Sequence, residues 1–550
     1  MLHVDHLRQN APAHDIDAFI KRASGRYYTG EVVGKRLAAL VARKMAGHGA
    51  KSCLKIIDPF GGDGRLIEWL ISAWHEQGHP SVKWDVTIID IDDVGFGTCE
   101  ERINRLVVSG IEIKSTLLAC DAFVATKRLE RDFDGVITNP PWGLLKPDRR
   151  EIARLPTDRQ KDYVDKMRDY DNWLCEHYPL SQPRRKFAGW GTNLSRVGLE
   201  ASLLLARPRG IVGVVLPASI LADEQSFLLR KHLITEHALL DVAHFTAEQK
   251  YYEAVDVESI TIVAEINSPP PNEVPFHTSR LSRSKNTSAT LRLNKESLES
   301  VDYVLPVNIG VDTTAILGRI TSRLPRWRDL ENNGCFWAGR EIDETGSAIW
   351  LRDSHHQGPL FIKGRMIDRF SITREPAQKV GKKGWSSPAS CQVQRIVWRD
   401  VSRPNQKRRM IATLIPAGWV AGNSLGVACF KDGDETALRA LLGVMTSTTF
   451  EFQLRGYLAT SHISLGSLRK VAIPSEASLK NDVTLSLLVQ RRIQGDATAE
   501  VEADAYVAHN VYGLSRDEYS EVLDQFAKLT DIERDAFLDA YERQLRMRHR

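Results

Sequence analysis

Four short apolar runs, each followed by a polar side chain, occur in the N-terminal part of this 550-residue chain with the spacing of a doubly wound sheet. They cover residues 54–57, 86–89, 115–119 and 135–138, and the polar side chains that follow are Asp58, Asp90, Asp121 and Asn139. The runs are predicted to be buried strands, with helices between them, as in a parallel α/β sheet. Ligands bind at the carboxyl ends of parallel strands, so the four side chains are expected to share one site. A single Asp after a strand is usually a helix cap, and only the fourfold recurrence favours a ligand.

The fourth turn has a composition that suits a planar ring carrying an exocyclic amine. It consists of Asn139, Pro140, Pro141 and Trp142. The ring would stack on Trp142, and the Asn139 side-chain oxygen and the Pro140 carbonyl would accept the two amine hydrogens. Because the lone pair of an aryl amine is delocalised, two such acceptors would localise it as a bond forms. A strand-ending turn with a core Trp is the alternative interpretation.

The first turn is rich in glycine and opens a predicted amphipathic helix from about residue 65. It runs from Asp58 to Gly64, and its glycines allow the backbone to pass close to a ligand. The turn lacks the GxGxxG phosphate pattern, and Asp58 suits a ligand with a cationic amino group. By the same reasoning Asp90 is placed to accept from ribose hydroxyls, and Asp121 from an adenine amine beside Phe123.

In this order, the motifs resemble those of the gamma arrangement of S-adenosylmethionine-dependent DNA adenine-N6 methyltransferases of type II restriction–modification systems. Residues 25–33 are similar to the motif that closes over the cofactor, with Gly30 in place of the usual Pro. The apolar helix expected at residues 197–205 and the strand at 211–217 agree with the same family. The resemblance implies a Rossmann-like doubly wound methyltransferase sheet that binds S-adenosyl-L-methionine.

The resemblance also implies residue roles. The implied cofactor-binding residues are Tyr28, Thr29, Asp58, Pro59, Phe60, Gly61, Asp90, Ile91, Asp121 and Ala122. The implied catalytic residues are Asn139, Pro140, Pro141, Trp142 and Tyr252, of which Tyr252 would pack against a flipped target base. Ordinary strand-end packing is the alternative for Tyr252 and for its neighbour Tyr251.

Proline content and helical patterning suggest the domain boundaries. Residues 1–268 are expected to form the cofactor-binding and catalytic domain, and the Pro-rich residues 269–275 a stiff linker. Residues 276–475 are expected to form an α+β target-recognition domain, followed by a helical region at 476–550. Residues 144–185, directly after the catalytic turn, carry many charges of both signs and either lean over the DNA or form a flap.

Basic residues concentrate in the C-terminal half, although the formal net charge of the whole chain is only +4. Between residues 351 and 420 there are 14 Lys and Arg against four acidic residues. Lys and Arg can neutralise phosphates, and Arg, Asn and Gln can read base edges, whereas a solvated basic face is the alternative. The expected DNA contacts are in residues 395–409, hereafter the basic segment, and comprise Arg395, Arg399, Arg403, Asn405, Gln406, Lys407 and Arg408.

The remaining features of the sequence favour a bacterial cytoplasmic enzyme, associated with the nucleoid through DNA. Seven scattered cysteines without a CxxC pair favour reduced thiols, with neither a metal site nor a disulfide framework. No apolar run reaches the roughly 18 to 20 residues needed to span a bilayer, and the N-terminus lacks a secretory apolar core. Expected partners are double-stranded DNA and a cognate restriction endonuclease or defence-complex subunits, and a monomer is one candidate state.

Several other functions remain compatible with the motifs. The same Asn-Pro-Pro-aromatic chemistry serves enzymes that methylate RNA bases or protein glutamine amides, and cytosine-N4 methylation usually carries Ser at the position of Asn139. A non-catalytic DNA-recognition subunit of a defence complex is the alternative from another class. The motif order and the basic C-terminal half favour a DNA adenine-N6 methyltransferase that flips its target base, and no fused nuclease is expected.

Overall fold

The structure is a computed structural model. It describes residues 29–49, 51–147, 152–183, 190–246, 251, 258–279, 288–293, 298–299, 301–306, 309, 313–342, 344, 358–380, 386–403, 406–458 and 461–548. The chain forms two compact units. Unit 1 comprises residues 1–281 and 286–304, and unit 2 comprises residues 282–285 and 305–550.

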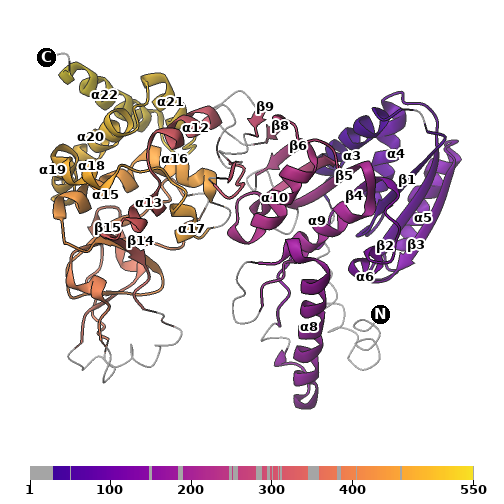
Figure 1. The fold of residues 1–550 in the computed structure, drawn as a ribbon, viewed down its shortest axis with the longest axis horizontal. Helices are drawn as coiled ribbons and strands as arrows, with labels where there is room; N and C mark the ends of the chain where they lie inside the picture. The colour runs from indigo at the N-terminus through magenta and orange to yellow at the C-terminus, as the bar shows by residue number, and fades with distance from the viewer. Residues whose placement is uncertain are drawn as a thin grey trace. The chain divides into compact units, whose positions relative to one another are not determined.

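From α3 to β4, unit 1 alternates helices and strands along the chain (Figure 1). Its elements are α3 (Glu31–Ala46), β1 (Cys53–Asp58), α4 (Arg65–Glu76), β2 (Lys83–Asp90), α5 (Phe96–Val108), β3 (Ile113–Ala119), α6 (Ala122–Thr126), β4 (Phe133–Thr138), α8 (Thr157–His177), α9 (Leu194–Leu205), β5 (Ala206–Pro217), α10 (Phe227–Glu236), β6 (Ala238–Phe245), β7 (Ser259–Glu265), β8 (Glu273–Thr278) and β9 (Ser288–Arg292).

The strands form one sheet in the order β3-β2-β1-β4-β5-β7-β6-β8-β9. Strands β1 to β5 are parallel, and β7 runs antiparallel between β5 and β6. The direction of winding reverses between β1 and β4, which are neighbours in the sheet. Such a switch point leaves a crevice at the carboxyl ends of the strands. The expected Rossmann-like doubly wound methyltransferase sheet is confirmed, and its switch point lies between Asp58 and Asn139.

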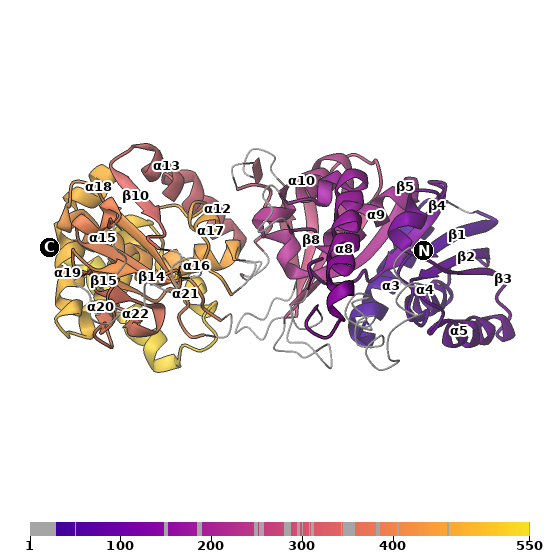
Figure 2. The same ribbon diagram turned by 90° about the horizontal axis from the view of Figure 1, so that it is seen from below.

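Helices cover both faces of this sheet. One core cluster joins α3, α4 and α5 to the sheet through buried side chains such as Leu37, Leu70 and Ile103. A second cluster, on the other face, joins Phe123 of α6 to Val197 and to residues at the end of α8. Figure 2 shows the sheet between the two helix layers. In α4 the buried residues recur along one face, which accounts for the packing of this helix against the sheet.

Two strands differ from the sequence expectation. Strand β5 begins at Ala206, directly after α9, and passes through an irregularity where Arg209 has a φ of 65°. Within the expected linker at residues 269–275, the chain already enters β8, which pairs with β6 and β9. Pro275 fits there because pairing with β6 begins only at the next residue, Phe276. The structure therefore places the boundary between the units later, near residue 304.

Unit 2 combines an antiparallel sheet with a helical layer. The sheet has the order β10-β17-β14-β15, and α15 packs against β14, β15 and β17. The C-terminal helices pack on α15 and α16, so they belong to the same compact unit as the sheet. Its elements are α12 (Thr314–Arg323), α13 (Trp327–Asn332), β10 (Phe336–Gly339), β11 (Phe361–Ile362), β12 (Ile367–Asp368), β13 (Ser371–Ile372), β14 (Arg395–Arg399), β15 (Ala412–Ile415), β16 (Val420–Ala421), β17 (Leu425–Phe430), α15 (Glu435–Thr446), α16 (Thr448–Tyr457), α17 (Leu465–Leu468), α18 (Glu476–Asn481), α19 (Val483–Ile493), α20 (Thr498–Tyr506), α21 (Arg516–Asp524) and α22 (Asp531–Arg548).

Candidate functional site

Asp58, at the end of β1, is fully buried and tied to the neighbouring strand β4. Its Oδ1 accepts hydrogen bonds from the Thr138 hydroxyl at 2.6 Å and from the Phe60 amide at 3.1 Å. Burial raises the pKa of Asp58 to about 7, although these two hydrogen bonds oppose the shift. A cation beside the carboxylate would offset the cost of burying its charge. The end of β1 is therefore suited to a positively charged ligand group.

Asp90, at the end of β2, holds the glycine-rich turn that follows β1. Its Oδ2 accepts from the Gly62 amide at 2.9 Å, and its backbone carbonyl accepts from the Cys120 amide at 2.8 Å. The second contact brings the ends of β2 and β3 together. Ile91, directly after Asp90, is 36% exposed and offers an apolar surface beside it.

Asp121 follows β3 and caps the short helix α6. Its Oδ1 accepts from the amides of Phe123 at 2.8 Å and Val124 at 3.4 Å, which confirms the cap geometry considered for an isolated Asp. Its Oδ2 accepts from the hydroxyl of Tyr170 on α8 at 2.7 Å. The rings of Phe123 and Phe60 lie 5.1 Å apart, so the turns after β1 and β3 share an aromatic wall.

The turn after β4 packs against α9. Asn139 is half-buried and Pro140 is buried. Gly198 of α9 makes room for this turn, because a Cβ atom built there would lie 2.2 Å from Pro140 Cβ and 3.5 Å from Phe60 Cε2. Trp142 packs against the core of unit 1 on one side and is half-buried. The carboxyl ends of β1 to β4 thus form one connected group of polar and aromatic side chains.

Thr29 and Gly30 lie against the same region. Thr29 is buried, and its carbonyl accepts from Arg65 of α4 at 3.1 Å. A Cβ at position 30 would lie 2.5 Å from the Tyr251 carbonyl oxygen, a backbone atom that cannot easily move. This close approach accounts for Gly30 where the resembling family carries Pro. Tyr28, Tyr252 and Asn405, which the sequence assigns to cofactor, catalysis and DNA, lie outside the described residues.

An ion cluster that the sequence analysis did not identify supports the glycine-rich turn. Asp63 pairs with Arg65 at 2.8 Å and with Arg102 of α5 at 3.0 Å. Burial favours the neutral acid, but the guanidinium of Arg65, with that of Arg102, leaves the pKa of Asp63 below its usual value. Thr138, Tyr170 and Gly198 were also missed. Thr138 could have been noticed because it places a hydroxyl at the end of an otherwise apolar run. The sequence contains no comparable signal for Tyr170 or Gly198.

The structure corrects part of the prediction that the basic segment contacts DNA. Arg395 is fully buried, forms an ion pair with Glu341 at 2.8 Å and donates to the Trp419 carbonyl at 2.5 Å. Arg399 donates to the carbonyls of Gly364 and Ile367. These guanidinium groups satisfy carbonyls within unit 2, so Arg395 in particular is a structural residue and not a DNA contact.

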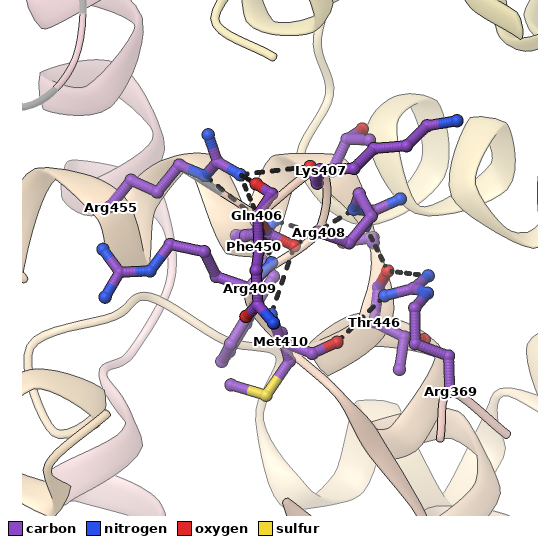
Figure 3. A network of polar contacts seen from close by, with 12 residues as sticks. Arg369, Gln406, Lys407, Arg408, Arg409, Met410, Thr446, Phe450 and Arg455 are labelled. Atoms are coloured by element: carbon purple, nitrogen blue, oxygen red, sulfur yellow. Dashed lines mark hydrogen bonds and ion pairs between the residues drawn. The ribbon is translucent and has the colours of Figure 1, made fainter. Parts of the chain in front are cut away.

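Arg408 is likewise held inside unit 2, where Figure 3 shows it in a network of polar contacts with Thr446 and Arg455 nearby. The carboxylate at the centre of this network is Glu451 of α16. Arg408 donates to Glu451 at 3.0 Å and to the Thr446 carbonyl at 2.6 Å, and Arg455 donates to Glu451 at 2.7 Å. Burial alone would raise the pKa of Glu451, but Arg455 and Arg408 lower it to about 2. The assignment of Arg408 to DNA is therefore also corrected.

The other described members of the basic segment lie nearer the surface. Arg403 is exposed, and Lys407 is 42% exposed and pairs with Glu533 of α22. Gln406 is half-buried and accepts from the Ser402 hydroxyl at 2.6 Å. Elsewhere on unit 2, a hollow of about 530 Å³ between α13 and β10 is lined by Trp337, by Arg328, Lys431 and Arg469, and by the acidic Glu331, which pairs with Arg469 at 2.6 Å.

Metal and membrane sites are absent from the part of the chain that the structure describes. No group of three or more His, Cys, Asp or Glu side chains is placed to hold a metal ion there. None of the helices described is both long and apolar enough to cross a membrane.

Comparisons with known proteins find similarity in structure only. No protein-family model and no curated protein matches the sequence. The type IIG restriction endonuclease BpuSI matches over 96% of this chain and 68% of its own, with 13% identity and a TM-score of 0.45. The type IIL restriction–modification enzyme MmeI, solved with DNA, matches over 98% of this chain and 77% of its own, with 12% identity and a TM-score of 0.45.

A shorter match covers half of the chain. The type I restriction–modification methyltransferase subunit from Streptococcus thermophilus matches over 54% of this chain and 59% of its own, with 15% identity and a TM-score of 0.32. At these identities and TM-scores, the matches say nothing about the chemistry of this chain. The proposed chemistry is inferred from its own residues.

Substituting Gly198→Ala tests the packing of the turn after β4. Alanine normally favours a helix interior, but here its methyl group would displace Pro140, and overpacking of this kind costs about 1–3 kcal/mol. We expect a lower unfolding midpoint in urea, measured by circular dichroism. Gly97→Ala is the control, because Gly97 in α5 has open space around it and should be neutral or slightly stabilised. Equal stability of both variants would contradict the close contact.

Substituting Glu451→Gln tests the buried network. Removing the carboxylate leaves the guanidinium groups of Arg408 and Arg455 buried beside a neutral group, which should cost about 3 kcal/mol in the free energy of unfolding near neutral pH. Because the pKa of Glu451 is lower in the folded protein than its usual 4.5, this stabilisation is present above that value and is lost as the pH falls towards 2. The difference between wild type and variant should therefore shrink on acidification.

Glu435→Gln provides the matched control for Glu451→Gln. Glu435 pairs with Arg439 on α15, but its side chain is 61% exposed, so the change should stay within about 0.5 kcal/mol. If Glu451→Gln were as mild as Glu435→Gln, the network would not stabilise unit 2.

Proposed function

We propose that this protein is a site-specific DNA methyltransferase that transfers a methyl group from S-adenosyl-L-methionine to the N6 amine of adenine in duplex DNA. The observation that carries the proposal is the alignment of Asp58, Asp90 and Asp121 on consecutive parallel strands beside the Asn139 turn. The restriction–modification or related defence setting rests on the order of these motifs along the sequence.

The residues at the four strand ends fit the proposed cofactor in chemistry. Burial raises the pKa of the Asp58 carboxyl group, and a cationic amino group beside it would lower that pKa again. Asp90 lies beside the glycine-rich turn and can accept from ribose hydroxyls. Asp121, next to Phe123 and Ala122, can accept from an adenine amine. When bound, the cofactor supplies an electrophilic methyl group on a sulfonium.

In the proposed mechanism, the residues of the chain position and polarise the target. An adenine leaves the base stack at a cost of a few kcal/mol and stacks on Trp142. The Asn139 side-chain oxygen and the Pro140 carbonyl accept its amine hydrogens, which localises the nitrogen lone pair for direct attack. The contact between Gly198 and Pro140 fixes the position of the carbonyl. Tyr252 stays the proposed second aromatic against the target base.

DNA contacts are proposed for the exposed part of the basic segment. Arg403 and Lys407 are accessible to phosphates, and Asn405 remains a proposed contact from the sequence. The cations that line the hollow between α13 and β10 are further candidates for phosphate contact, because they gather beside Trp337. A cognate nuclease or a defence-complex subunit would be a partner of this activity.

Sequencing of modified bases tests the function directly. DNA from a methylation-deficient host that expresses this chain should carry N6-methyladenine confined to one short sequence motif. DNA from a host expressing Asn139→Ala should carry none. If the purified protein instead transfers labelled methyl groups to RNA or to protein glutamine and not to DNA, the DNA assignment is wrong.

Asn139→Ala should separate catalysis from cofactor binding. Losing an acceptor for developing charge lowers turnover by at least about a hundredfold. The affinity for S-adenosylmethionine, measured by calorimetry, should stay within about twofold, because the cofactor is assigned to Asp58, Asp90 and Asp121. Asn104→Ala, an exposed asparagine of α5, is the control and should keep wild-type turnover. Near-wild-type turnover in Asn139→Ala would defeat the assignment of the catalytic turn.

Cofactor affinity should depend on pH through Asp58. Because the pKa of Asp58 is about 7, the carboxylate is mostly neutral near pH 6 and mostly ionised near pH 7.5. Binding of a cationic amino group needs the ionised form, so affinity should rise by roughly an order of magnitude over this range. Calorimetric titrations in buffers of constant ionic strength would measure the rise.

Two variants identify the titrating group. Asp58→Asn should bind weakly and lose the pH dependence, whereas Asp90→Asn should bind weakly and keep it, since Asp58 is intact. A pH dependence that survives in Asp58→Asn would assign the titration to another group.

A further inference from the structure

We propose that helix α8 forms a wall of the cofactor site, and that its Tyr170 is a positioning residue that aims Asp121 at the adenine amine. The inference rests on the proposed function and assigns a role to a segment whose role the sequence left open. It concerns residues 157–183, hereafter the α8 segment, which follow the catalytic turn in the chain.

Tyr170 controls the orientation of the Asp121 carboxylate. The Oδ1 atom of Asp121 is occupied as the cap of α6 by two backbone amides. Rotation about the terminal torsion of an Asp side chain is otherwise soft, so the cap alone defines the other oxygen poorly. The Tyr170 hydroxyl donates to that oxygen, Oδ2, at 2.7 Å. It fixes the plane of the carboxylate and leaves Oδ2 with further capacity to accept.

The hydroxyl of Tyr170 is a permanent donor. Desolvation, together with the charge of Asp121, raises the pKa of Tyr170 well above its usual value, so the proton stays on the tyrosine. Asp121 is consequently presented as an acceptor. An acceptor favours adenine, which carries an exocyclic amine, over hypoxanthine, which carries an oxygen at the same position.

The α8 segment is anchored firmly enough to serve as a wall. The Tyr178 hydroxyl donates to the carbonyl of Phe123 at 2.5 Å, and Phe123 belongs to α6, the helix that Asp121 caps. Leu174 and Tyr178 are buried in the cluster that contains Phe123 and Val197. The amide of Ser181 donates to Glu200 of α9 at 2.7 Å. The α8 segment is thus anchored to α6 and to α9.

The stretches of chain that precede and follow the α8 segment are hydrogen-bonded to each other beside the catalytic turn. The Leu145 amide donates to the Thr192 carbonyl and the Leu194 amide to the Gly143 carbonyl, each at 2.8 Å. Gly143 directly follows Trp142. The part of the chain that carries α8 therefore contacts the adenine end of the proposed cofactor site through Tyr170 and begins and ends beside the catalytic turn, which places α8 next to the proposed site.

The test compares two nucleoside probes in the full-length protein. S-adenosylhomocysteine carries the amine, and S-inosylhomocysteine carries an oxygen in its place. Calorimetry should show that the wild type prefers the adenosyl compound. Tyr170→Phe keeps the ring and removes the hydroxyl, and it should reduce that preference about tenfold, since hydrogen bonds to charged groups are among the stronger ones.

Tyr178→Phe is the matched control. It also removes a hydroxyl from the interface between the α8 segment and α6, but that hydroxyl donates to the Phe123 carbonyl and not to Asp121. It should lower the melting temperature and leave the preference between the two probes unchanged. A general loosening of α8 would instead affect both variants alike, and this result would overturn the positioning role.

The outcomes separate this inference from the proposed function. If the wild type binds the adenosyl compound with a clear preference and Tyr170→Phe keeps that preference, the role of Tyr170 is wrong and the methyltransferase assignment stands. If the wild type binds neither probe, the proposed function fails and this inference with it. Loss of the preference in Tyr170→Phe alone supports the inference.

Discussion

A buried hydrogen bond between two strands links the parts of the candidate site. Thr138, the last residue of β4, donates to Asp58, the last residue of β1, at 2.6 Å. The two strands are neighbours only because the winding of the sheet reverses between them. This bond therefore joins the proposed cofactor site to the proposed catalytic turn at the switch point. It also keeps the Asp58 carboxylate in place although burial disfavours its charge.

The first four parallel strands of unit 1, β1 to β4, could be predicted from the sequence because they are short, largely apolar and each followed by a polar turn. Asp58, Asp90, Asp121 and Asn139 all lie at the carboxyl ends of parallel strands, as expected. Tyr170 could not be predicted, because its partner Asp121 is distant in sequence and belongs to another element. Prolines normally exclude a central strand, but Pro275 lies in β8, one residue before the pairing with β6 begins.

The basic segment shows why local charge is a weak guide to function. Arg395 and Arg408 have the composition of a DNA-binding run, but each lies beside a buried carboxylate that is remote in sequence, Glu341 or Glu451. Guanidinium groups have several donors in a fixed plane and can satisfy carbonyls and carboxylates together. Whether an Arg faces solvent or core depends on that tertiary pairing, which the sequence pattern does not contain.

The network around Glu451 has a consequence for how the protein could be dissected or recombined. Arg369 of the segment between β12 and β13 pairs with Glu500 of α20 at 2.7 Å, and Arg408 lies 3.8 Å from Asp504 of the same helix. If the chain were cut before the C-terminal helices, these guanidinium groups would lose the carboxylates of α20. Chimeras that exchange unit 2 between related proteins should therefore carry β10 through α22 as one block, with both halves of the network from a single parent.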